Sequence, residues 1–149
     1  AQVAALAILC LSGARGIYVL AVAERPPLQI SIPDDDWGRV MAWARTTDID
    51  SGWLADPLHA VLYGTSVRVA GERDVLVEAV KDAALGMYDR RIAVRTSERI
   101  RAVPDFLRLT PAEARRLGAT YDLDYLVTEQ MLDLPLAFQE GALRVYRIQ

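Results

Sequence analysis

The chain has 149 residues, of which 52% are hydrophobic and 25% are charged, and its 17 basic and 20 acidic side chains give a net charge of -3. This balance is typical of a folded protein with room for one core, and it argues against a nucleic-acid partner, whose binding face would need clustered Lys and Arg. A single cysteine, Cys10, excludes an intrachain disulfide and the usual zinc patterns, so we expect no metal and no cofactor.

The first 24 residues are the most apolar part of the chain. Between Val3 and Ala23 the only charge is Arg15, and a helix of this length would extend about 31 Å, close to the hydrocarbon thickness of a bilayer. We therefore predict a membrane helix over 1–24. Arg15 near mid-membrane would cost about 2.5 to 3.5 kcal/mol, so the helix fits best at the end of a longer membrane region. A start at Ala1 rather than Met also leads us to expect a processed protein or a fragment.

Two alternatives stay open for this segment. Ala21-Val22-Ala23 has the small-x-small form of a signal-peptide cleavage site, although no basic region precedes it. The segment could instead be a buried helix of a soluble domain. In each case Arg25-Pro26-Pro27 predicts the end of the helix, and we assign 25–33 to a linker and 34–149 to a soluble domain.

Three consecutive acids open the soluble part. Asp34, Asp35 and Asp36 precede Trp37, Val40, Met41 and Ala44, which have the i, i+3, i+4, i+7 spacing of one helix face. Acids before such a stripe occupy the cap and first turn, where free amides and the helix dipole favour negative charge. A metal site would need acids from separate elements. The pattern therefore predicts a helix start and no metal site.

The middle of the chain is predicted to contain short strands. Gly52 to Pro57 is predicted to be a buried strand ended by proline, and Leu58 to Tyr63 a helical turn closed by Gly64. Ser66 to Ala70 alternates polar and apolar residues, which predicts a strand, and Val75 to Val77 is a second β-rich run after a turn.

Helices and a hairpin are expected to complete the domain. Lys81 to Val103 is helical in composition, with a break near Gly86 or at Thr96-Ser97, and Thr110-Pro111-Ala112-Glu113 predicts a capped helix start. Tyr125 to Glu129 is a predicted strand, followed by a hairpin around Glu140-Gly141. The fold class is therefore α/β: a small mixed sheet flanked by helices, with a C-terminal antiparallel hairpin and a preceding apolar helix.

Sequence motifs for catalysis are missing. The chain has neither a glycine-rich phosphate loop nor a G-x-S-x-G elbow, and we assign no catalytic residue. His59, the only histidine, follows Asp56 at the end of a predicted strand, where open α/β sheets bind ligands. Arg73 and Lys81 flank the next strand, so Asp56, His59, Arg73 and Lys81 form a candidate ligand site. The alternative is that His59 is a cap or packing residue.

Several stretches together resemble a known group of proteins. These are "DDDWGRVMAWART", "WLADP", "GERDVLVEAVKD", "LTPAEARRLGATYDLDYLVTE" and "GALRVYRI", preceded by an apolar helix and a proline-bearing linker. They resemble the C-terminal extracytoplasmic α/β domains of bacterial multi-spanning membrane proteins related to glycosyltransferases that use lipid-linked sugars.

The resemblance implies a non-catalytic accessory domain at the bacterial cell membrane. Chemistry in such proteins belongs to acids in the upstream membrane portion, so no catalytic position can be carried over. Implied partners are the upstream membrane helices of the same protein, the lipid bilayer, and a lipid-linked sugar or polymer. Two other hypotheses remain: a free-standing ligand-binding or enzymatic domain with the site above, and an interaction module that docks a partner through Trp37 and Trp43.

Overall fold

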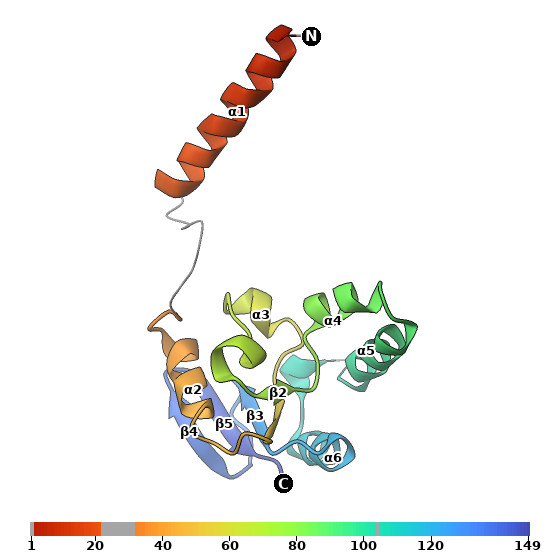
Figure 1. Cartoon of the computed structure of the whole chain (residues 1–149). Helices are drawn as coiled ribbons and strands as arrows, with labels where there is room; N and C mark the ends of the chain where they lie inside the picture. Colours follow the sequence, from red (N-terminus) through yellow and green to blue (C-terminus); the bar gives the residue numbers. More distant parts are fainter. Residues whose placement is uncertain (1, 22–31, 104) are drawn as a thin grey trace. The chain divides into compact units, whose positions relative to one another are not determined.

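The computed structural model describes residues 2–21, 32–103 and 105–149. It divides into two compact units, residues 1–32 and 33–149, and each is described by itself (Figure 1). The first unit contains helix α1 (Gln2–Ala21). The predicted linker over 25–33, with the helix end at Pro26, lies almost wholly outside the described residues.

Helix α1 presents apolar side chains to solvent on all sides. The described ones are 59% to 71% exposed: Leu6, Ile8, Leu9, Leu11, Ile17 and Tyr18. The prediction of a helix in this segment is thereby confirmed, and its membrane location stays a prediction. Among the described residues, no helix combines the length and apolarity needed to cross a membrane.

The second unit is a mixed α/β domain, as predicted. Its sheet has the strand order β2-β1-β3-β5-β4. Strand β1 pairs in parallel with both β2 and β3, whereas β5 pairs antiparallel with β3 and β4. Its elements, in chain order, are α2 (Asp36–Ala44), β1 (Gly52–Leu54), α3 (His59–Leu62), η1 (Val67–Gly71), β2 (Asp74–Val75), α4 (Ala79–Gly86), α5 (Arg90–Ala102), η2 (Phe106–Arg108), α6 (Pro111–Tyr121), β3 (Tyr125–Thr128), β4 (Leu136–Glu140) and β5 (Leu143–Arg147).

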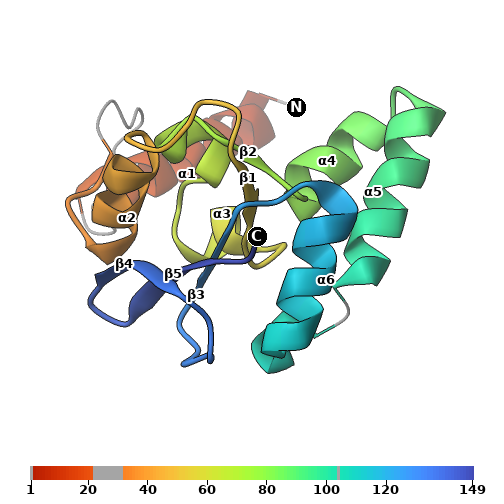
Figure 2. The ribbon, with the colours of Figure 1, turned by 90° about the horizontal axis from the view of Figure 1, so that it is seen from below.

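Alternating side chains of the strands feed two separate cores. On β3, Leu126 belongs to the core beneath α6, while its neighbour Val127 belongs to the core beneath α2. This is the period-two geometry of a strand buried on both faces. Figures 1 and 2 show α2 near β4 and β5, with α4, α5 and α6 gathered on the other side of the domain. The helices therefore cover both faces of a small sheet.

Helix α2 begins as the sequence predicted. Asp35 is the N-cap, and its side chain accepts a hydrogen bond from the amide of Gly38 at 2.7 Å. Asp36 occupies the first turn and pairs with Arg39 at 2.8 Å. Trp37, Val40, Met41 and Ala44 are all buried, as the helical stripe required. The acidic run is a helix start.

The strand predicted at Ser66 to Ala70 is wrong. The segment is instead the π-helical turn η1, with Ser66 as its cap accepting from the amide of Val69. Val67, Ala70 and Gly71 are buried together beneath α2. A Cβ on Gly71 would lie 3.1 Å from the Met41 sulfur, so glycine permits this close approach. Packing against α2 outweighed the local alternation of polar and apolar residues.

The later elements largely follow prediction. The break in the predicted long helix lies between α4 and α5, just after Gly86, whereas Thr96 is buried within α5. Thr110 and Glu113 form the expected capping box at the start of α6. Strands β4 and β5 form the expected hairpin, with Gly141 at φ +54° in its turn. Positive φ suits glycine because it has no Cβ to clash.

Candidate ligand site at the strand ends

A hollow lies where the parallel strands β1 and β3 end. Asp56 follows β1, Glu129 follows β3, and both line a cavity of about 550 Å³. Ligand pockets in proteins typically measure about 300 to 1,000 Å³ and occur at this edge of open α/β sheets. We call this hollow the strand-end cavity; its lining also includes Trp37, Leu58, Leu62, Tyr63, Phe106 and Leu107.

Aromatic and leucine side chains form most of the cavity wall. The rings of Trp37 and Tyr63 stack with their centroids 4.4 Å apart and an interplanar angle of 11°. Trp37 also anchors the wall, because its indole N–H donates to the carbonyl of Thr65 at 3.1 Å. Leu62 and Leu107 remain exposed beside this pair, in which Trp37 is buried and Tyr63 is half-buried. The wall can therefore bury part of an apolar ligand without rearrangement of the core.

The hydroxyl of Tyr63 contacts one of the two carboxylates that line the strand-end cavity. This hydroxyl donates to Glu129 Oε1 at 3.0 Å. Burial, the hydrogen bond to Glu129 and the negative charges of Glu129 and Asp56 together raise the pKa of Tyr63 to about 12. Asp56 Oδ1 also accepts from the amide of Leu58 at 2.7 Å. Both acids therefore add negative charge to the lining of the cavity.

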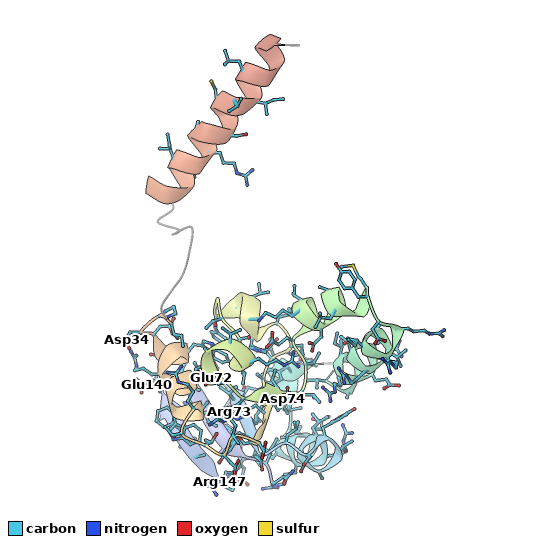
Figure 3. The ribbon with its side chains drawn as sticks, in the orientation of Figure 1. Asp34, Glu72, Arg73, Asp74, Glu140 and Arg147 are labelled. Atoms are coloured by element: carbon cyan, nitrogen blue, oxygen red, sulfur yellow. The ribbon has the colours of Figure 1, made fainter. Side chains whose placement is uncertain are left out.

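A second hollow of about 390 Å³ adjoins the first. It shares Trp37, Tyr63 and Glu129 with the strand-end cavity and adds Asp35 and Asp36. Asp36 belongs to the ion pairs of Arg39, which also contacts Asp34 and Glu140, the two acids labelled side by side in Figure 3. We call the two hollows together the acidic groove.

His59 serves the fold and has no free nitrogen. It is fully buried, and the amide of Val67 donates to its Nε2 at 3.2 Å. Since an amide can only donate, the proton sits on Nδ1, which donates to the carbonyl of Asp56 at 2.7 Å. Burial lowers the pKa of His59, so the ring is held neutral. The packing interpretation therefore fits His59, although its ring lines the cavity.

Arg73 lies away from the cavity. Its guanidinium donates to the carbonyls of Arg45 at 2.8 Å and Thr47 at 2.6 Å, and so it closes the end of α2. Within the α/β domain, Figure 3 labels Arg73 below α3, the helix that carries His59 (Figure 1). Arg73 is almost completely buried and holds two segments of the backbone together.

Lys81 belongs to a third environment. Its ammonium lies 3.3 Å from Glu78 Oε2 and 3.3 Å from the Ser66 hydroxyl. Arg68 joins the same cluster through Asp82, with Nη1 and Oδ1 2.6 Å apart. We call Arg68, Glu78, Lys81 and Asp82 the ion cluster. Of the four predicted ligand residues, only Asp56 and His59 line the strand-end cavity.

Sequence reasoning missed the most important residues of this cavity. Glu129 was placed at the end of a predicted strand, and an acid at that position was the available signal for a site. Tyr63 gave no such signal, because only the fold brings α3 beside β3. Trp37 is 3% exposed, so the hypothesis of a docking face that includes an exposed Trp37 is wrong.

The acidic groove offers oxygen ligands and apolar walls but little catalytic machinery. Within the described ranges, no group of three or more His, Cys, Asp or Glu residues is arranged to hold a metal ion. The lining of the two hollows, over the same ranges, contains no Lys or Arg. Comparison of the chain with family models, curated proteins and solved structures yields no match.

Proposed function

We propose that this chain is a non-catalytic, extracytoplasmic accessory domain of a multi-spanning membrane protein related to glycosyltransferases. Helix α1 anchors it among the apolar helices of that protein. The α/β domain lies on the outer face, where it covers or stabilises the membrane portion. The observation that carries the anchoring role is the exposure of apolar side chains all around α1.

A helix that is apolar on every side needs a cover other than water. Successive residues turn by about 100° around a helix, so Leu6, Ile8 and Leu9 point in three different directions, and all are at least 65% exposed. Exposed apolar area of this extent marks a membrane or protein contact. Both hydrophobic cores of the α/β domain are built from residues 37–148.

The experiment replaces apolar residues of α1 by arginine. The whole chain is expressed in bacteria, and membranes are washed with alkaline carbonate, which releases peripheral proteins. We expect the parent chain to stay in the membrane pellet and the variant Leu9→Arg/Ile17→Arg to move to the supernatant, because each charge in a membrane helix costs about 2.5 to 3.5 kcal/mol. An equal distribution of both proteins would contradict anchoring through α1.

A matched control separates this effect from a general gain of charge. Met131 is 81% exposed in the α/β domain, so Met131→Arg should leave the protein in the pellet. Sidedness is read from a Cys10→Ser/Glu98→Cys variant treated in intact cells with a membrane-impermeant maleimide. Labelling without cell lysis is expected; labelling only after lysis would contradict an extracytoplasmic location.

The strand-end cavity favours a second function, the binding of a small ligand. Its position and its volume of about 550 Å³ support this proposal. Leu62 lines the cavity and is exposed, so Leu62→Trp should fill the cavity without disturbing the core. A fragment screen by thermal shift should give hits that Leu62→Trp abolishes and Leu85→Trp, on exposed α4, retains. If the fragments bind the Leu62→Trp variant as well as the parent protein, the cavity is not their binding site.

A further inference from the structure

We propose that the acidic groove selects an organic cation: a small soluble amine with an apolar body. This proposal rests on the second function above and names its ligand class. The leucine and aromatic wall receives the apolar body, and the carboxylates of Asp56 and Glu129 receive the ammonium group.

The charges around the groove point to a cation. The strand-end cavity has the carboxylates of Asp56 and Glu129 in its lining, and the adjoining hollow adds those of Asp35 and Asp36. Among the described lining residues there is no Lys or Arg, and the only basic ring, that of His59, has both nitrogens hydrogen-bonded within the fold. Arg39 pairs with Asp36, and Arg144 donates to the backbone carbonyl of Glu129 at 2.8 Å. The attraction for a cation therefore comes from the carboxylates of Asp56 and Glu129.

The acids have unequal capacity for a ligand. Asp35 caps α2, and Asp36 is paired with Arg39. Asp56 and Glu129 each accept one uncharged donor, the Leu58 amide and the Tyr63 hydroxyl. A carboxylate offers about four acceptor sites, so each keeps acceptor capacity for an ammonium group. Both carboxylates line the strand-end cavity, so this capacity is available to one ligand.

The cavity wall explains why the ammonium should carry an apolar body. Phe106 is buried in the wall, and Leu58, Leu62 and Leu107 are exposed along it. Burying apolar ligand surface against them contributes about 25 cal/mol per Å². A bare inorganic cation would leave this surface in water, whereas an amine with a compact hydrocarbon body uses both features.

The test compares three probes with the same cyclohexyl body: cyclohexylmethylammonium, cyclohexylmethanol and cyclohexanecarboxylate. The whole chain is titrated at neutral pH, and binding is followed by tryptophan fluorescence, because Trp37 lines the cavity. We expect the ammonium to bind about tenfold more tightly than the alcohol, as hydrogen bonds to charged groups are the stronger ones. The carboxylate should bind least, and added salt should reduce the preference.

Isosteric variants locate the selectivity. Glu129→Gln should weaken the binding of the ammonium probe about threefold. The double variant Asp56→Asn/Glu129→Gln should remove the preference for the ammonium over the alcohol and leave binding of the alcohol unchanged. Glu98→Gln, the same chemical change on α5, should have no effect. Equal binding of ammonium and alcohol, a loss in Glu98→Gln equal to that in Glu129→Gln, or no binding of any probe would overturn the proposal. If Leu62→Trp abolishes binding of the alcohol, the cavity is still supported as a ligand site even where the ammonium has no advantage. The membrane association of the chain is tested by the separate carbonate-wash experiment.

Discussion

Two groups of acids in the domain differ in their surroundings. In the ion cluster, Asp82 is bonded to Arg68 at 2.6 Å, and Glu78 has Lys81 at 3.3 Å. In the strand-end cavity, the carboxylates of Asp56 and Glu129 accept from an amide and a hydroxyl, and Arg144 donates to the backbone carbonyl of Glu129 at 2.8 Å. The comparison teaches that the same residue type serves two purposes. Acids whose carboxylates pair with Arg or Lys hold segments together, and acids whose carboxylates have no such pair can recognise a ligand.

The largest effect on stability should come from a substitution that breaks the ion cluster. Arg68 donates to Asp82 and to the carbonyl of Val75 and also faces Glu78. Arg68→Met should lower the free energy of unfolding by about 3 kcal/mol, because it leaves partly buried acids without their cation. Urea unfolding followed by tryptophan fluorescence measures this, since Trp37, Trp43 and Trp53 all lie in the α/β domain. Arg91→Met, at a highly exposed ion pair, should leave the urea midpoint unchanged.

An amide substitution at Asp82 tests the ion cluster more finely. Asp82→Asn keeps an acceptor for the Glu78 amide, 2.9 Å away, but loses the charge that pairs with Arg68. It should cost about 2 kcal/mol in the same urea assay. Bonding to Arg68 lowers the pKa of Asp82 despite its burial, so the parent protein should lose this contribution as the pH falls through the acid range. A urea midpoint as unchanged as that expected for Arg91→Met would contradict the structural role of the cluster.

His59, which lines the strand-end cavity, should make stability depend on pH. Burial lowers its pKa from the ordinary value of 6.5, so the unfolded chain takes up a proton that the folded chain does not. Stability is therefore full above pH 6.5 and decreases as the pH falls below it, by up to about 1 kcal/mol between pH 6.5 and 5.5. Urea midpoints across this range should show the slope in the parent protein and lose it in His59→Gln. A flat parent profile would contradict a buried, neutral ring.

The smallest effect on stability is expected for the acids of the strand-end cavity. Glu129→Gln keeps an acceptor for the Tyr63 hydroxyl and lies at an exposed hydrogen bond. It should change the free energy of unfolding by less than about 0.5 kcal/mol, while it weakens ammonium binding as described above. A destabilisation as large as that of Asp82→Asn would show that Glu129 is a structural residue.

Local signals in the sequence predicted much of the fold. The acidic run before Trp37 predicted the start of α2, and Thr110 with Glu113 predicted the start of α6. Gly141 marked the turn of the hairpin. These features depend on hydrogen bonds and backbone angles of neighbouring residues, so a short stretch is sufficient to specify them. The alternation of polar and apolar residues at 66–70 led to the wrong prediction of a strand. The segment forms a π-helical turn because it packs against α2.

The candidate site was only partly predictable for the same physical reason. Asp56 and His59 were found because they follow a predicted strand, and both line the cavity. Arg73 and Lys81 are near them in sequence, but their long side chains reach other partners. The helical nature of α1, the turn of the C-terminal hairpin and the capped helix starts were determined by the sequence itself. Only the tertiary structure decided that Tyr63 and Glu129 meet, 66 positions apart, and which acids receive a cation, because such contacts depend on how distant segments pack.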